Sequence, residues 1–420
     1  MSPNIIKAIS EYSNGLGFDS AHVSLWFGSG SDNIVKALQD NNESDSFRVI
    51  MQKYQIDNTN KQYGDYQEIY VKANNVVNSL IVKDEKEFGV AHYTTIDIAS
   101  KMLFDHSEIR QFSIKKVNDP SEGKTLLCYL QDDNSPINLN NLDCTYQAFV
   151  TCFTFNHNHL NQFRLYGKAN HTERKYDKIS KKDKIYVYQK ECAGLSLLFN
   201  GNFFSKQEVL IAPDIISNTK NVNDTKPTLY RCLYIDPDTK QIVSVGQRDK
   251  YTFYRKSKYS EDTIKSDSEY NKYQNSINDV MKHVETEMSS LAKAVNEMSN
   301  KDDRIIADLL INLRYLVKHY AFKEEQECRI IQVKNISDVS HYAKDGIKKE
   351  KNKLYLEAGD IGNHVDRIFF APCADEKMIN LFLYKLKYSE LNINHYISNL
   401  PFENVSLRQT RRRRSRRRTR

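Results

Sequence analysis

The sequence predicts an α+β protein in which helices lie before, inside and after a strand-rich centre. Two observations lead to this prediction. Residues 1–85 follow mostly helical patterns, whereas short β-branched and aromatic runs dominate from about residue 88 onward. The 420-residue chain is 40% apolar but holds only 14 Gly and 8 Pro, which favours a large core and disfavours a turn-dense all-β sandwich. We therefore expect a helical region over 1–85, an α+β domain over 86–402 and a disordered Arg-rich tail over 403–420.

The first helices are expected at 33–38 and 67–83, where apolar residues of the second segment recur at helical spacing. A further amphipathic helix is expected at 95–106, with Thr95 as its N-cap. The expected strands of the centre share alternating or aromatic-rich sequences: 88–93, 112–117, 148–155, 185–188, 195–199, 209–212, 229–235 and 241–246.

A helical insertion is predicted at about 260–320. Apolar residues keep three-to-four spacing over 268–298, and a second helix is expected at 303–319, so the two would form a hairpin that packs on the sheet. The alternative is a partner-binding helix, because its Met-rich face would suit an adaptable groove. Beyond the insertion we expect strands at 328–333, 367–370 and 394–398, and a helix at 376–387.

The positive charge of the chain is concentrated at its C-terminus. Lys and Arg number 61 and Asp and Glu 54, but nine arginines lie in the last thirteen residues, so the rest of the chain is nearly neutral. This distribution excludes a uniformly basic, nucleic-acid-coating protein. Such a tail suits RNA or DNA phosphates, a nuclear-import receptor or an anionic membrane. Its predicted targeting or nucleic-acid residues are Arg411, Arg412, Arg413, Arg414, Arg416, Arg417 and Arg418.

The seven cysteines are scattered and include no C-x-x-C pair, which predicts free thiols in a reducing compartment. No apolar run is long enough to span a bilayer, and the N-terminus lacks the features of a Sec signal peptide. The Lys, Asn and Tyr-rich body is typical of a bacterial protein. Together with a nuclear-type tail, it predicts residence in the bacterial cytoplasm followed by delivery into a host cell and its nucleus.

Three segments combine strand ends with polar residues. His92, Tyr93 and Thr94 end a predicted strand just before a helix, whose N-terminus suits an anionic ligand; the alternative is an ordinary surface histidine. Asn118 and Asp119 follow the next strand, in a sequence equally typical of a turn. Glu325, Glu327 and Arg329 would share one strand face, which means either an exposed edge or a lined cleft.

Two weaker patterns lie near the middle of the chain. Cys152, His157 and His159 resemble metal ligands only loosely, because no carboxylate or second Cys has matching spacing, and we predict no metal site. Arg164 and Tyr166, in the segment Phe163-Arg164-Leu165-Tyr166-Gly167, have the side chains needed to stack on a planar ligand.

Taken in order, these motifs resemble a bacterial family, the domain of unknown function 2971, over about residues 88–400. The resemblance rests on His92-Tyr93, Asn118-Asp119-Pro120-Ser121-Glu122, Cys152-Phe153-Thr154, the aromatic segment Gln162-Phe163-Arg164-Leu165-Tyr166-Gly167, Gly194-Leu195-Ser196 and Glu325-Gln326-Glu327-Cys328-Arg329. Two positions depart from the family pattern: Phe163-Arg164 replaces Met-Trp, and Cys328 replaces an aromatic residue. If the segment 162–167 forms a wall of a ligand site, we expect the activity to be altered or lost.

The layout of these motifs is also similar to that of ADP-ribosyltransferases, which have a split sheet and use NAD. The similarity implies that His92 binds the ribose, Tyr166 stacks on the nicotinamide ring and Glu327 is the catalytic carboxylate. Glu325 would activate the acceptor. We therefore expect a bacterial effector or toxin that modifies a host protein or nucleic acid. The alternatives are a non-catalytic protein that binds a host nuclear protein, and a nucleic-acid-binding protein.

Overall fold

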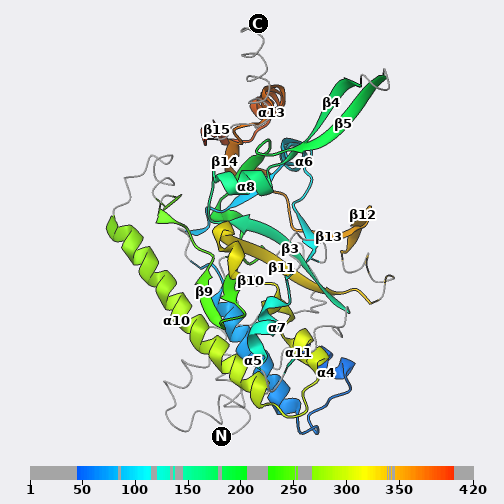
Figure 1. Ribbon diagram of the computed structural model, residues 1–420, viewed down its shortest axis with the longest axis vertical. Helices are drawn as coiled ribbons and strands as arrows, with labels where there is room; N and C mark the ends of the chain where they lie inside the picture. Colours follow the sequence, from blue (N-terminus) through cyan, green and yellow to red (C-terminus); the bar gives the residue numbers. More distant parts are fainter. Residues whose placement is uncertain are drawn as a thin grey trace.

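The computed structural model describes residues 45–401, except 84–86, 115–120, 133–135, 138–144, 178–181, 206–225, 251, 254–266, 338, 340–341 and 343–345. Within this part the chain forms a mixed α/β structure around one large mixed sheet (Figure 1). Helices gather at both ends of the molecule, and a two-stranded hairpin projects from it. This agrees with the predicted α+β class at the level of mixed helices and strands.

Among the described residues the large sheet has ten strands, eight of which follow the order β12-β13-β2-β3-β1-β6-β14-β15. In chain order these are β1 (Ala91–Thr94), β2 (Arg110–Ser113), β3 (Tyr146–Thr154), β6 (Leu195–Phe199), β12 (Lys348–Glu350), β13 (Lys353–Glu357), β14 (Val365–Phe370) and β15 (Asn394–Ile397). The remaining two, β7 (Tyr230–Arg231) and β11 (Glu327–Asn335), extend the sheet from the other edge of β3.

The sheet divides along strand β3, and this division creates the space for a site. Strand β11 pairs with β3 over the whole length of both strands. On its other edge β3 pairs with β2 at Phe149 and Val150, and with β1 only at Thr154. The intervening residues 151–153 pair with neither strand on that edge. Strands β1 and β2 therefore diverge from one point of β3 and leave a gap that side chains line.

Helices of three sequence regions form one core at the lower end of the molecule in Figure 1. They are α4 (Asp45–Lys53), α5 (Tyr63–Ser79), α7 (Thr125–Leu130), α10 (Asp267–Glu297), α11 (Asp303–Leu309) and α12 (Ile311–Arg314). Buried Ile69 and Val76 of α5 share the apolar cluster with Val284 and Leu291 of α10. The described part of the N-terminal region and the insertion therefore pack against each other.

A second core covers the opposite end of the sheet. It is built from α6 (Ile96–Phe104), α13 (Glu376–Tyr388) and apolar residues of β6 and β14. Thr95 caps α6 as predicted, because its hydroxyl accepts a hydrogen bond from the Ile98 amide at 3.2 Å. Asp375 caps α13 in the same way through the amides of Lys377 and Met378.

Two smaller sheets complete the described structure. Strands β10 (Val317–His319), β8 (Leu233–Asp236) and β9 (Gln241–Val245) form the first, with β10 parallel to β8. Strands β4 (Ala169–Asp177) and β5 (Lys182–Lys190) form the projecting hairpin.

The structure corrects the helical hairpin predicted for the insertion. Its first arm is α10, but the second arm breaks into α11 and α12, and residues 317–319 form strand β10 instead of the end of a helix. Pairing with β8 overrides the helical pattern there. Strands β4, β12 and β13 and helices α7 and α8 (Leu160–Leu165) were not predicted. The predicted elements at 33–38 and 209–212 lie outside the described residues.

Candidate functional site

A cluster of buried charged side chains lies at the start of strand β11, and Lys318 of β10 is at its centre. It contains three carboxylates and two cations, from Glu122, Glu325, Glu327, Lys318 and Arg329. The Lys318 Nζ donates to Glu327 Oε2 at 2.5 Å and also to Glu325 Oε2. Each of these five side chains is at most 10% exposed. With all three carboxylates ionised the cluster has one excess negative charge, and it lies apart from the bulk water that would screen it.

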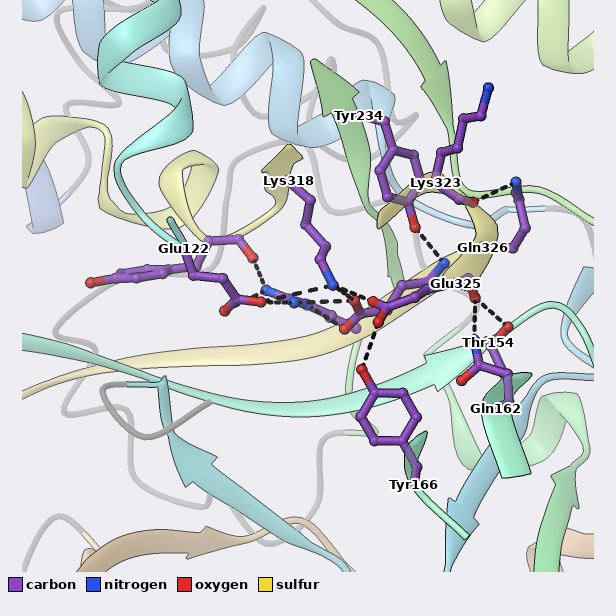
Figure 2. A network of polar contacts seen from close by, with 12 residues as sticks. Glu122, Thr154, Gln162, Tyr166, Tyr234, Lys318, Lys323, Glu325 and Gln326 are labelled. Atoms are coloured by element: carbon purple, nitrogen blue, oxygen red, sulfur yellow. Dashed lines mark hydrogen bonds and ion pairs between the residues drawn. The ribbon is translucent and has the colours of Figure 1, made fainter. Parts of the chain in front are cut away.

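The polypeptide turns sharply between the two central glutamates. Glu325 is the last residue of the short helix η7 (Tyr320–Glu325), Gln326 adopts the left-handed conformation with φ 45°, and Glu327 opens β11. The prediction that Glu325 shares a strand face with Glu327 was therefore wrong in its local structure. Their carboxylates nevertheless converge on Lys318 (Figure 2), because the turn at Gln326 brings Glu325 over the end of the strand.

Hydrogen bonds to the backbone hold both glutamates in place. The carbonyl of Glu325 accepts hydrogen bonds from Thr154 Oγ1 at 2.7 Å and Gln162 Nε2 at 3.1 Å (Figure 2). The amide of Glu327 donates to Tyr234 Oη at 2.8 Å. Beneath the strand, a Cβ on Gly246 would lie 2.2 Å from the Glu327 carbonyl oxygen, so only glycine permits this approach.

Arg329 joins Glu327 to Glu122. Its Nε donates to Glu327 Oε1 at 2.7 Å, and its Nη2 donates to Glu122 Oε1 at 2.5 Å. Its Nη1 donates to the carbonyl of Tyr315 at 2.7 Å. The guanidinium is thereby satisfied on all sides, as a buried arginine requires. Glu122, which the sequence analysis named only as the last residue of the Asn118-Asp119-Pro120-Ser121-Glu122 motif, is thus part of the cluster.

The pKa values of the two glutamates shift in opposite directions. Burial alone would raise the pKa of Glu327, but the charges of Arg329 and Lys318 outweigh burial and lower it. For Glu325, burial prevails over the attraction of Lys318, and the charge of Glu327 adds to it, so its pKa is raised. Glu327 therefore stays ionised, while Glu325 takes up a proton more readily. Two neighbouring carboxylates whose pKa values are shifted in opposite directions are typical of sites where one carboxylate stabilises charge and the other transfers a proton.

Tyr166 approaches the cluster from the opposite side to Lys318 (Figure 2). Its hydroxyl donates to Glu325 Oε1 at 2.7 Å. Burial of the hydroxyl and the nearby charges of Glu325 and Glu327 raise the Tyr166 pKa, so the phenol remains protonated. The residue as a whole is 38% exposed, and its ring is accessible to a ligand.

The charged cluster opens into a pocket of about 470 Å³, a volume typical of small-molecule sites. The pocket occupies the gap along β3, between β1 and β2. Its lining includes predicted site residues from β1, from the segment after α8, from the end of η7 and from the start of β11: His92, Tyr93, Thr94, Tyr166, Glu325 and Glu327. Cys152, Arg110, Lys101 and Glu350 line other parts of it. The structure thus brings together residues that are more than two hundred positions apart in the sequence.

His92 lies where β1 and β3 diverge. Its Nδ1 is 2.9 Å from the carbonyl oxygen of Cys152, a β3 residue that pairs with neither β1 nor β2. The carbonyl accepts, so Nδ1 bears the hydrogen and a neutral ring presents Nε2 as an acceptor. Burial lowers the pKa of His92, which favours this neutral form. Such a nitrogen can accept a hydrogen bond from a hydroxyl group of a ligand.

Other predicted residues have different placements. The Arg164 Nε lies 3.3 Å from Glu191 and the side chain lines a neighbouring pocket, so it does not join the main pocket. Tyr93 lines the main pocket, but its hydroxyl is occupied by the Asn156 carbonyl and the His159 amide. Asn118, Asp119 and the arginine tail lie outside the described residues.

Sequence reasoning missed Lys318 and Gln162. Lys318 was assigned to a helix, and no local signal marked it, because its importance comes from the three carboxylates that the fold brings to it. Gln162 lies in the unpredicted helix α8. Among the described residues, no group of His, Cys, Asp and Glu has an arrangement that would hold a metal ion. Across the same residues, no helix is both long and apolar enough to cross a membrane.

Fold and site together define a class: a mixed α/β protein with a pocket of small-molecule size whose wall includes two carboxylates of a buried ion cluster. Comparison of the chain with models of protein families, with curated proteins and with solved structures gave no match. The resemblance to the domain of unknown function 2971 and to ADP-ribosyltransferases therefore stays a prediction from the sequence.

Proposed function

We propose that the pocket catalyses NAD-dependent transfer of an ADP-ribosyl group, within an effector or toxin that acts in a host cell. The observation that supports this most is the common pocket of His92, Tyr166, Glu325 and Glu327. A neutral hydrogen-bond acceptor, an accessible aromatic ring and two carboxylates whose pKa values are shifted apart suit breakage of the bond between a ribose carbon and the pyridinium nitrogen of nicotinamide.

Each residue has a distinct role in this proposal. His92 accepts a hydrogen bond from a ribose hydroxyl, and the Tyr166 ring contacts the nicotinamide. Glu327 remains an anion and stabilises the positive charge that develops at the sugar carbon. Glu325, with its raised pKa, accepts the proton of the incoming acceptor. Bound NAD would supply the ADP-ribosyl group itself.

The first test is NAD hydrolysis by Glu327→Gln. The amide keeps the shape of the side chain but removes the charge, and we expect the turnover rate to fall by about 10²–10³-fold. Glu327 is also part of a buried ion cluster, so thermal unfolding must show that the variant is folded. Glu285→Gln, on the exposed face of α10, is the matched control and should retain full turnover.

Tyr166→Phe provides a second test, which removes no charged group from the buried cluster. The ring remains, and only the hydrogen bond to Glu325 is lost. We expect a lower turnover rate and a displaced pH profile, because the pKa of Glu325 loses one of its hydrogen-bond donors. Failure of the wild-type protein to bind or hydrolyse NAD would overturn the proposed reaction.

A second candidate function, a non-catalytic protein that binds a host nuclear protein, has one observation in its favour. Leu381, Tyr384 and Tyr388 are exposed on α13 at spacings that bring them to one helix face. In both candidates the arginine tail would direct the protein to the nucleus through an import receptor. Absence of NAD turnover, combined with loss of partner binding in Tyr384→Ser, would favour this second function.

A further inference from the structure

The turn that joins Glu325 to Glu327 has an uncommon residue at its centre. Gln326 adopts the left-handed conformation, with φ 45° and ψ 49°. Glycine and asparagine take up this conformation far more readily than a residue with a longer side chain. A glutamine at this position costs backbone free energy, and such a conformation persists only where surrounding contacts hold it.

The side-chain amide of Gln326 supplies two of these contacts. Its Oε1 accepts a hydrogen bond from the Gln247 amide at 2.9 Å. Its Nε2 donates to the Lys323 carbonyl at 2.8 Å (Figure 2). The backbone is held as well, because the Gln326 amide donates to the same Lys323 carbonyl at 3.1 Å and its carbonyl accepts from the Phe155 amide at 3.0 Å. Side chain and backbone together therefore fix the turn.

The segment 246–248, which holds the side chain of Gln326, is anchored on both sides of residue 247. Before it, Gly246 packs against the Glu327 carbonyl. After it, the buried guanidinium of Arg248 donates to the Phe155 carbonyl at 3.0 Å. The amide of Arg248 donates to Tyr273 Oη of α10 at 2.8 Å. The anchor is thus tied to the large sheet and to the helical insertion.

Gln326 is not part of the pocket that its two neighbours line. Glu325 and Glu327 line the main pocket, whereas the side chain of Gln326 is directed to the segment 246–248. A ligand in the main pocket therefore meets the two carboxylates without meeting Gln326. Any effect of this residue on a reaction in the pocket has to pass through the turn.

We infer that Gln326 is a positioning residue, whose amide fixes the turn and thereby the places of the two carboxylates. This inference rests on the proposed function for its kinetic readout. With the turn fixed, the Glu325 carboxylate reaches the hydroxyl of Tyr166. The Glu327 carboxylate remains paired with Arg329 at the start of β11. Loss of the amide would let the turn relax, and both carboxylates would leave these partners.

The test replaces Gln326 with glycine in the full chain. Glycine adopts the left-handed conformation readily, so the variant loses the side-chain hydrogen bonds without new backbone strain. We expect kcat for NAD hydrolysis to fall by about 10–10²-fold, as for a displacement of about 1 Å at the reacting groups. KM should stay the same, because Gln326 does not line the pocket.

Two further variants accompany this one. Gln326→Asn also tolerates the left-handed conformation, but its amide is one methylene group too short to make both hydrogen bonds, so kcat should fall as well. The matched control is Gln55→Gly, because Gln55 is an exposed glutamine with φ 56° between α4 and α5. It should retain the kcat of the wild type. An unchanged kcat in Gln326→Gly, or an equal fall in the control, would overturn the inference.

A second measurement does not depend on turnover. NMR of isotope-labelled glutamate carboxyl groups is followed over pH, with Glu325 and Glu327 assigned from their Gln variants. In Gln326→Gly the raised pKa of Glu325 and the lowered pKa of Glu327 should both move toward the usual 4.5. Titrations identical to those of the wild type would overturn the inference. Absence of NAD turnover in the wild type would instead contradict the proposed reaction, and the titrations would still decide the role of Gln326.

Discussion

At the scale of single residues, Lys318 is the most consequential side chain of the site. Its ammonium lies among Glu122, Glu325 and Glu327, with no other cation than Arg329 in the cluster. Lys318→Met should lower the free energy of unfolding by about 3–5 kcal/mol, because it leaves buried carboxylates without a partner. Urea denaturation checks this, with Lys293→Met in an exposed pair as the control; there we expect a change below about 1 kcal/mol. Equal effects would show that the cluster is not desolvated.

A second prediction at this scale concerns Glu327 and the way in which the free energy of unfolding depends on pH. Its pKa in the folded protein is lowered below the usual 4.5. Its contribution to stability is therefore fully present above pH 4.5 and is lost as the pH falls toward the folded value. Chemical denaturation at a series of acidic pH values should show a steeper loss in the wild type than in Glu327→Gln. Parallel curves for the two proteins would contradict the assignment of Glu327 as the ionised carboxylate.

At the scale of elements, helix α10 holds the lower core together through its contact with α5. Leu291 is fully buried in that core, so Leu291→Ala should cost about 2–5 kcal/mol of unfolding free energy. His283 lies on the exposed face of the same helix, and His283→Ala should change stability little. Thermal and urea unfolding give the unfolding free energies of the two variants, which compares the buried face of α10 with its exposed face. A small effect of Leu291→Ala would mean that α10 does not pack as described.

Element boundaries also show where sequence patterns and tertiary structure diverge. Strands β3, β6 and β11 were predicted closely, because buried apolar and β-branched runs mark them. Helix α6 was predicted together with its cap. Strand β10 was mistaken for helix, because the preceding residues keep helical spacing and only pairing with β8 selects the extended form. Within the hairpin, β5 was predicted at 185–188, whereas β4 has too polar a sequence to signal a strand.

At the scale of the whole molecule, the body and the tail are predicted to act separately. Removal of residues 408–420 takes away nine arginines and leaves a body of nearly balanced charge. We expect purified protein without these residues to retain NAD turnover, while a fluorescent fusion in host cells loses its nuclear accumulation. Microscopy of the two fusions provides the measurement. An unchanged distribution would contradict the targeting role of the tail.

The sequence by itself determined the mixed α/β class, most core strands and the identity of His92, Tyr166, Glu325 and Glu327 as candidates. It did so because periodicity and polar residues at strand ends are local signals. Only the tertiary structure decided that these four line one pocket, that Lys318 pairs with Glu325 and Glu327 and that Arg164 belongs to a neighbouring pocket. The reason is physical: the gap along β3, the burial of the charges and the opposite pKa shifts of Glu325 and Glu327 all arise from contacts between residues far apart in the chain.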